Sequence, residues 1–156
     1  MEFRKNDIVT LEIVDCGTDG EGIGKADGFT VFVKDAVIGD TVTAKIMKAK
    51  KNYGYGRLME ILNASPYRVE PVCPSARQCG GCQLQAVSYE EQKVFKEKKL
   101  RGHLERIGGF TNLPMEPLIG MDEPYHYRNK AQFPVGRNKE GKNCRWFLCW
   151  TYTRYY

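Results

Sequence analysis

The first sixty or so residues form short alternating or β-branched runs separated by glycine and aspartate, and this rhythm constrains the fold more than any other feature. β-Branched and aromatic residues favour extended backbone, and a run of roughly four to eight residues between turn signals is typical of a strand. Such runs occupy residues 9–15, 29–37, 40–51 and 55–62. Five glycines crowd residues 17–28 and indicate a tight, hairpin-like connection. About five strands in this length predict a mainly β fold that begins with a small OB-like barrel.

The glycine-rich connection could be mistaken for a phosphate-binding loop. It lacks the Gly-Lys-Ser/Thr ending of such a loop, and Asp19, Glu21 and Asp27 would repel phosphate. A turn between strands explains it better.

Residues 63–74 contain Pro66, Pro71 and Pro74, each of which removes a backbone donor and biases the preceding residue to extended geometry. This composition predicts a linker. A helix is expected to follow, because Ser88 and Glu91 have the spacing of a capping box. No glycine or proline interrupts residues 89–101, and the helix is expected to end at Gly108 and Gly109.

The predicted helix has an imperfect apolar face formed by Tyr89, Leu100, Leu104 and Ile107. Residues 125–142 then read as a strand, a turn at residues 138–141 and the start of another strand. These elements predict an incomplete α+β segment after the barrel.

Three closely spaced cysteines, Cys73, Cys79 and Cys82, form a C-x5-C-x2-C pattern, and the intervening glycines let the backbone wrap closely around a bound group. Zinc favours paired C-x2-C knuckles, whereas an iron–sulfur cluster accepts uneven loops and a distant fourth cysteine. The pattern therefore favours an iron–sulfur cluster and leaves zinc or structural thiols as alternatives. Cys16 and both histidines have no partner at ligand spacing and are assigned no role.

Cations and tyrosines are interleaved in the region of the last barrel strands. Lysine and arginine attract phosphates, and tyrosine rings stack on unpaired bases. The alternative is a solvated lysine edge that blocks pairing with other strands. The tyrosines favour RNA binding by Lys45, Lys48, Lys50, Lys51, Tyr53, Tyr55 and Arg57.

The positive net charge of the chain agrees with an RNA partner. The net charge is +5, and no apolar run is long enough for a spanning helix or has the form of a signal peptide. We expect a cytoplasmic protein with reduced cysteines, no membrane association and no evident protein partner. No catalytic group and no S-adenosylmethionine site is identified from the residues.

The segment CPSARQCGGCQLQ at residues 73–85, followed by Tyr89 and Gln92, resembles the cluster motif of RNA (uracil-5-)-methyltransferases, and the expected barrel resembles their TRAM domain. The resemblance implies methylation of a uridine at C5 in ribosomal or transfer RNA with S-adenosylmethionine. It also implies a 4Fe-4S cluster held by four cysteines, three of which match Cys73, Cys79 and Cys82. The fourth ligand is not identified, although Cys144 and Cys149 are nearby candidates.

The resemblance runs from about residue 9 to residue 142, and the last fourteen residues are rich in aromatics and have no acidic residue. We expect four parts: a TRAM domain at 1–62, a cysteine loop with helix at 63–110, an incomplete central or methyltransferase region at 111–142, and an out-of-frame tail at 143–156. The implied function is the RNA-binding N-terminal part of an S-adenosylmethionine-dependent rRNA (uracil-5-)-methyltransferase, truncated before the catalytic domain and inactive alone. The alternative is a standalone RNA-binding zinc or iron–sulfur module without methyltransferase lineage.

Overall fold

The computed structural model describes residues 3–77, 81–127, 129–130, 135–137, 141 and 143–145. The chain divides into two compact units, Met1–Val87 and Ser88–Tyr156. The cysteine-bearing segment before Val87 thus lies in the same unit as the barrel, whereas the sequence placed residues 63–110 together. In the described part of the chain, no helix has the length and apolar character needed to cross a membrane.

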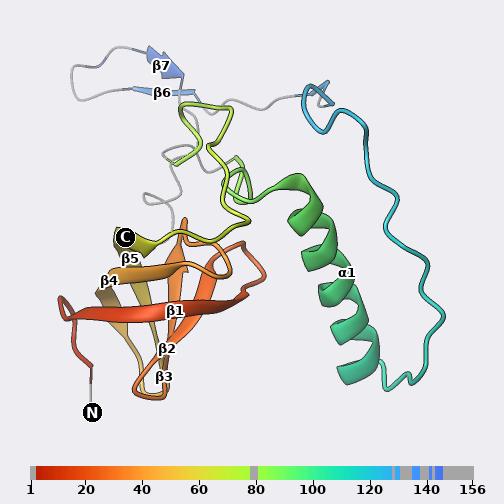
Figure 1. The fold of residues 1–156 in the computed structure, drawn as a ribbon. Helices are drawn as coiled ribbons and strands as arrows, with labels where there is room; N and C mark the ends of the chain where they lie inside the picture. The colour runs from red at the N-terminus through yellow and green to blue at the C-terminus, as the bar shows by residue number, and fades with distance from the viewer. Residues whose placement is uncertain are drawn as a thin grey trace. The chain divides into compact units, whose positions relative to one another are not determined.

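The first unit is a closed five-stranded barrel with the strand order β1-β2-β3-β5-β4 (Figure 1). Strands β3 and β5 pair in parallel, and the other neighbours pair antiparallel, with β4 returning to β1. The predicted OB-like barrel is confirmed. Its strands are β1 (Ile8–Cys16), β2 (Gly22–Ala26), β3 (Phe29–Lys34), β4 (Thr41–Ala49) and β5 (Tyr53–Asn63).

The barrel interior is filled by inward-facing apolar side chains that alternate with outward-facing residues, as a half-buried strand requires. The alternation is clearest on β4, where Val42, Ala44 and Ile46 are fully buried. The buried cluster consists of Val9, Leu11, Ile13, Val31, Val33, Ala36, Val42, Ala44 and Ile46. One shared core thus stabilises every strand that contributes to it.

Strand β2 lies inside the glycine-rich segment that the sequence predicted only as a connection. A Cβ atom at Gly24 would lie 2.4 Å from the Leu11 side chain, and one at Gly22 would lie 2.8 Å from Ile13. The glycines are therefore required where β2 passes close to the inward side chains of β1. Glycine fits this position because it has no side chain, and for the same reason it gives no strand signal in the sequence and looks like a turn residue.

A buried ion pair holds the predicted linker against the barrel. The Asp40 carboxylate is fully buried and accepts from Arg68 Nε at 3.1 Å and from Arg68 Nη2 at 2.5 Å. It also accepts from the backbone N–H groups of Ser65 at 2.9 Å and Val37 at 2.7 Å. Burial alone would raise the pKa of Asp40, but the hydrogen bonds from Arg68, Ser65 and Val37 outweigh it and lower that pKa. Residues 65–68 are consequently a fixed part of the first unit.

The second unit contains helix α1 (Tyr89–Arg106). The Ser88 side chain accepts a hydrogen bond from the Glu91 N–H at 3.4 Å, and Gly109 adopts a left-handed φ of 70° just beyond the helix. The predicted start and end are confirmed. The expected apolar face is not buried, since no helix residue is buried and Leu100 remains 50% exposed.

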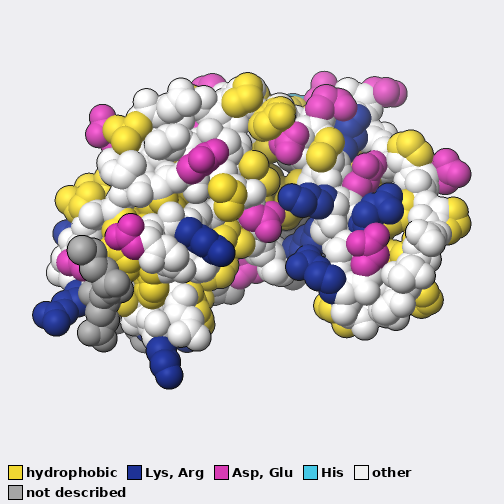
Figure 2. Space-filling model, turned by 60° about the horizontal axis from the view of Figure 1, so that its bottom comes forward, with side chains coloured by type: hydrophobic (Ala, Val, Ile, Leu, Met, Phe, Trp, Pro, Cys, Tyr) yellow, Lys and Arg dark blue, Asp and Glu magenta, His cyan; other side chains and the backbone are white. Residues whose placement is uncertain are grey.

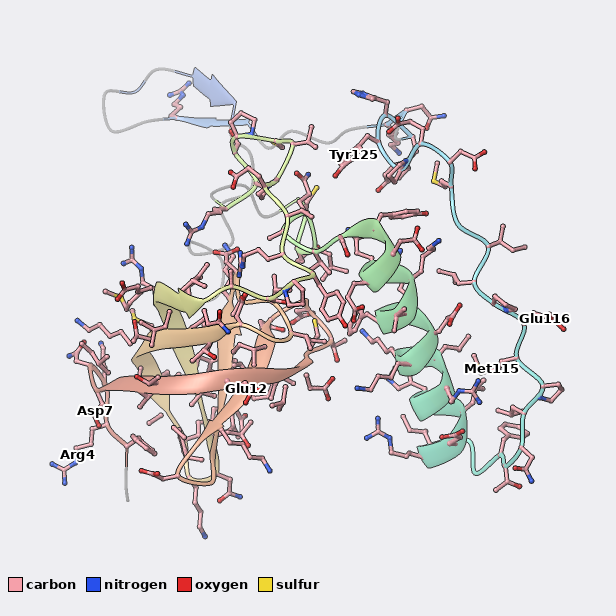
Figure 3. All side chains as sticks on the ribbon, in the orientation of Figure 1. Arg4, Asp7, Glu12, Met115, Glu116 and Tyr125 are labelled. Carbon is pink, nitrogen blue, oxygen red and sulfur yellow. The ribbon has the colours of Figure 1, made fainter. Side chains whose placement is uncertain are left out.

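An extended segment follows the helix and runs back beside it (Figure 1). The Leu118 N–H donates to the Glu97 carboxylate, and the Met121 N–H donates to the Tyr89 hydroxyl at 2.8 Å. Figure 3 labels Met115 and Glu116 on this segment. Polar contacts at the surface therefore fix the segment to the helix.

A two-stranded antiparallel sheet ends the described chain, with β6 (Val135–Arg137) paired with β7 (Asn143–Arg145). The two strands of the predicted strand–turn–strand pattern are thus present and paired where they are described. Residues 138–140 of the expected turn, and residues 146–156 of the expected aberrant tail, lie outside the described residues.

Candidate functional site

The outer surface of β4, β5 and β3 brings most of the predicted RNA-binding residues onto one face, which we call the barrel face. On β5 the sequence Tyr-Gly-Tyr-Gly alternates tyrosine outward with buried glycine inward. A Cβ atom at Gly56 would lie 3.0 Å from Val31 and 3.2 Å from Ala44. The small inward residues let β5 lie close to the core while Tyr53 and Tyr55 stay on the outside.

A row of cations crosses the barrel face. Arg57 of β5 lies opposite Lys45 of β4 and opposite Lys34 of β3. Residues directly opposite each other on neighbouring strands project to the same side of a sheet. Three positive side chains from three strands therefore stand next to one another without an acidic residue among them.

A second row, next to the first, is aromatic. Tyr55 lies opposite Lys48 of β4 and Phe32 of β3. The ring centroids of Phe32 and Tyr55 are 5.6 Å apart, and Tyr53 completes the cluster at 5.9 Å from Tyr55 and 5.8 Å from Phe32. All three rings are half-buried, so part of each ring is open to solvent. This cluster offers π surface beside a line of positive charge.

Lys50 and Lys51 lie in the turn between β4 and β5. The Lys50 ammonium donates to the Tyr53 hydroxyl at 3.0 Å and lies 5.2 Å from the centre of its ring. The hydrogen bond to Tyr53 raises the pKa of Lys50, and the same bond lowers the pKa of Tyr53. Lys50 therefore stays charged at neutral pH and extends the cationic surface to the turn.

Two residues of the barrel face, Phe32 and Lys34, were absent from the set predicted by sequence. Both lie on β3, more than ten residues before the cation–tyrosine segment, and reach the face only through the parallel pairing of β3 with β5. The extended run at residues 29–37 predicted a strand there but not which strand it pairs with. The pairing partner of β3 has no local sequence signal, so the sequence could not place them beside Tyr55 and Arg57.

The cysteine loop, residues 69–86, is closed at its base. The Val69 N–H donates to the Ala86 carbonyl at 3.0 Å, and Arg68 forms a β-bridge with Val87. Within the loop, the Cys73 N–H donates to Gln85 Oε1 at 3.2 Å. Cys73 and Cys82 are both exposed and carry free thiols.

Among the described residues, the cysteine loop contacts the barrel through Arg77 and Gln83. The Lys34 ammonium, part of the cation row, donates to the Arg77 carbonyl at 3.1 Å. A Cβ atom at Gly20 would lie 2.7 Å from the Gln83 side chain, so only glycine permits the loop to approach the β1–β2 turn this closely. The loop and the barrel face are thus neighbouring parts of one unit.

The donor chemistry of the loop suits a thiophilic group. Cys73 and Cys82 are both exposed and belong to one closed loop. Among the described residues, no three His, Cys, Asp or Glu side chains are grouped closely enough to hold a metal ion. Cys79 lies outside the described residues, as do Cys149 and the side chain of Cys144.

Sequence comparison relates the barrel to a known domain family and the chain to a group of known proteins. Residues 3–59 match the TRAM domain family. The chain is 49% identical over 138 residues to an uncharacterized RNA methyltransferase of Halalkalibacterium halodurans, and the match covers 88% of this chain and 30% of that protein. A protein of the same description from Clostridium acetobutylicum is 50% identical over 85% of this chain and 29% of its own length. The chain therefore spans about 30% of the length of these curated relatives.

Among solved structures, the chain is similar to the Pyrococcus abyssi tRNA (uracil-54, C5)-methyltransferase in complex with S-adenosyl-L-homocysteine. The identity is 29%, the match covers 64% of this chain and 21% of that one, and the TM-score is 0.43.

Proposed function

Because the chain carries a TRAM domain and belongs to the RNA methyltransferase family, we propose that it is the RNA-binding part of an RNA (uracil-5-)-methyltransferase. The resemblance of residues 73–85 to the cluster motif of uracil-5 enzymes supports the choice of uridine C5. We further propose S-adenosylmethionine as methyl donor and ribosomal RNA as substrate of the whole protein. The part played by this chain is to bind and position the RNA.

The observation that carries the proposal is the pair of rows on the barrel face. Lys34, Arg57 and Lys45 form the cation row, and Phe32 and Tyr55 form the aromatic row directly beside it. Backbone phosphates release counterions when lysine or arginine neutralises them, and unpaired bases stack on aromatic rings for about 1–3 kcal/mol each. A single strand can place its phosphates on one row and its bases on the other. A duplex keeps its bases stacked inside and can use only the cations.

The cation row can be tested by replacing Lys45 and Arg57 with glutamine. Each lost phosphate contact should reduce the slope of log affinity against log salt by about 0.7 for single-stranded RNA, so the double variant should lose about 1.4. The matched control is the double replacement of Lys5 and Lys25, two exposed lysines of the first unit outside the cation row, with the same change in charge. An equal loss of slope in both variants would place the RNA surface elsewhere.

The aromatic row has a separate test. Replacing Tyr55 by leucine keeps an apolar side chain but removes the ring, and should weaken binding of single-stranded RNA by about 1–3 kcal/mol while leaving duplex binding nearly unchanged. Fluorescence anisotropy with matched single-stranded and duplex oligonucleotides measures both. Equal weakening of both ligands would show that stacking is not the mode of binding.

We also propose that Cys73, Cys79 and Cys82 hold a 4Fe-4S cluster, for which the exposed thiols of the cysteine loop and its motif are the support. The cluster would anchor the loop next to Lys34, because the Lys34 ammonium donates to the Arg77 carbonyl of that loop. Protein purified without air should be brown and contain iron and inorganic sulfide, and Cys73→Ser should lose both. Stoichiometric zinc without iron would contradict the cluster and favour a zinc site.

A further inference from the structure

The three rings of the aromatic cluster, Phe32, Tyr53 and Tyr55, are not parallel to one another. The planes of Tyr53 and Tyr55 meet at 79°, and those of Tyr53 and Phe32 meet at 81°, whereas Phe32 and Tyr55 are tilted by only 33°. Hydrophobic side chains also reach the surface beside Lys and Arg on the face of the molecule that Figure 2 shows. The orientation of the rings, rather than their composition, therefore distinguishes the aromatic cluster.

The cluster offers two platforms for bases. Phe32 and Tyr55 form the first, because their ring centroids are 5.6 Å apart, which is the distance of rings in contact, and no base fits between them. Tyr53 forms the second and stands almost at a right angle to the first. Tyr53 and Tyr55 are both half-buried, so each keeps ring surface that a base can reach.

Contacts within the protein fix this crossed arrangement. Edge-to-face packing is a preferred geometry of aromatic pairs, and each ring of the cluster contacts the other two. The Lys50 ammonium lies 3.0 Å from the Tyr53 hydroxyl and 5.2 Å from the ring centre, so it holds Tyr53 from its hydroxyl end. The two platforms are therefore preorganised, and a bound RNA has to conform to them.

A base that stacks on an aromatic ring lies parallel to that ring. Neighbouring bases of a stacked strand are parallel to each other, so they cannot occupy two platforms that cross at 79°. We propose that the aromatic cluster selects RNA in which two neighbouring bases are splayed apart, as in a loop or a bulge, and this inference rests on the proposed function. Lys48, which lies opposite Tyr55, and Lys50, which is bonded to Tyr53, place one cation beside each platform for the phosphates of the bent strand.

A strand with an intact stack is a poorer partner for this cluster. Such a strand places a base on one platform only, or it has to be unstacked before both platforms are filled. Uridine stacks weakly on its neighbours and adenosine stacks strongly, so a uridine-rich strand is splayed at a lower cost. The crossed rings therefore predict a preference that depends on base stacking and not on the number of phosphates.

The test compares oligo(U) with oligo(A) of the same length, which carry the same phosphates and differ in base stacking. The parent protein should bind oligo(U) about 10-fold more tightly, because oligo(A) has to be unstacked on binding. A second readout uses a strand with two adjacent fluorescent purine analogues, whose coupled circular dichroism signal exists only while the two bases are stacked. Binding to the parent should abolish that signal.

Two variants assign these effects to the crossed rings. Tyr53→Leu removes the second platform, so the preference for oligo(U) should fall to about 2-fold and the coupled signal should persist in the complex. Tyr67→Leu is the matched control, because Tyr67 is an exposed tyrosine of the first unit outside the aromatic cluster, and it should leave both readouts unchanged. Thermal unfolding checks that both variants remain folded.

Equal affinity of the parent for the two strands, or a coupled signal that survives binding, would overturn the inference and leave the proposed function intact, since RNA would still bind. The inference would also fail if Tyr53→Leu kept the full preference for oligo(U), because the strand would then be bent elsewhere. No binding of either strand by the parent would overturn the proposed function itself.

Discussion

The barrel and the helix of this chain are stabilised in different ways. Nine apolar side chains are buried together inside the barrel, and the fully buried Asp40 ties the following segment to it. Helix α1, in contrast, has no buried residue and is held by its N-cap and by polar contacts with the segment after it. The barrel can hold a binding face rigidly by its own core, whereas the helix depends on local signals.

The largest difference between the two regions should appear on truncation of an apolar side chain. Ile46→Ala leaves a cavity in the fully buried core and should lower the free energy of unfolding of the barrel by about 2–5 kcal/mol. Leu100→Ala on the half-exposed helix should change stability by less than about 0.5 kcal/mol. Urea unfolding followed by circular dichroism measures both. A large effect of Leu100→Ala would show that the helix is packed in solution.

Removing the cation of the buried ion pair should have the next largest effect. Arg68→Met leaves the Asp40 carboxylate buried with two backbone N–H donors. The loss should be about 3 kcal/mol of barrel stability, the lower end of the range for a broken buried pair, because those two donors remain. It should also release residues 65–68 to limited proteolysis. Arg77→Met is the control, because its pair with Asp35 is 3.9 Å long and the Arg77 side chain is 67% exposed. Equal protease sensitivity of both variants would show that Arg68 does not fix the segment.

The same pair predicts a pH dependence confined to the barrel. The pKa of Asp40 is lower in the folded protein than its usual 3.8, so the ionised carboxylate stabilises the fold at every pH above that value. This contribution should be lost as the pH falls through the folded pKa. The urea midpoint should therefore drop more steeply below about pH 4 in the parent than in Asp40→Asn, whose side chain does not titrate. Parallel pH profiles would show that Asp40 is not the group responsible.

The barrel was predictable because its signals are local and mutually consistent. Alternation in residues 9–15 and 40–51 gave β1 and β4, and Ser88 with Glu91 gave the start of the helix. Strand β2 was missed because Gly22 and Gly24, which the crowded interior requires, look like turn residues. Residues 63–74 were predicted to be a linker, but Asp40 binds Ser65 and Arg68 and so fixes part of this segment to the barrel. The proline-rich composition of the segment could not show this, because Asp40 lies more than twenty residues earlier in the chain.

The barrel face was predictable in composition but not in arrangement. Lys45, Tyr55 and Arg57 follow from the interleaving of cations and tyrosines in one segment. Their order into a cation row and an aromatic row depends on the register of β5 with β4 and β3, which also adds Phe32 and Lys34. Non-local pairing of this kind leaves no periodic trace in a single sequence. The cysteine ligand set stays a prediction, since Cys79 lies outside the described residues.

The smallest predicted effect concerns the helix cap and separates the two regions most directly. Ser88→Ala removes the side chain that accepts from the Glu91 N–H, and a lost N-cap usually costs about 0.5–2 kcal/mol. We expect the lower end of this range, because the hydrogen bond is 3.4 Å long and therefore weak. Amide hydrogen exchange should accelerate in the first turns of α1 and stay unchanged in β4, since the cap belongs to the second unit and the buried cluster that stabilises β4 consists of barrel residues. Ser88→Asp should restore the protection, because aspartate is an equally good N-cap and its charge suits the helix N-terminus. If Ser88→Ala instead accelerated exchange in β4 as much as in α1, the helix and the barrel would unfold as one cooperative unit, and the contrast between a core-stabilised barrel and a locally stabilised helix would be wrong.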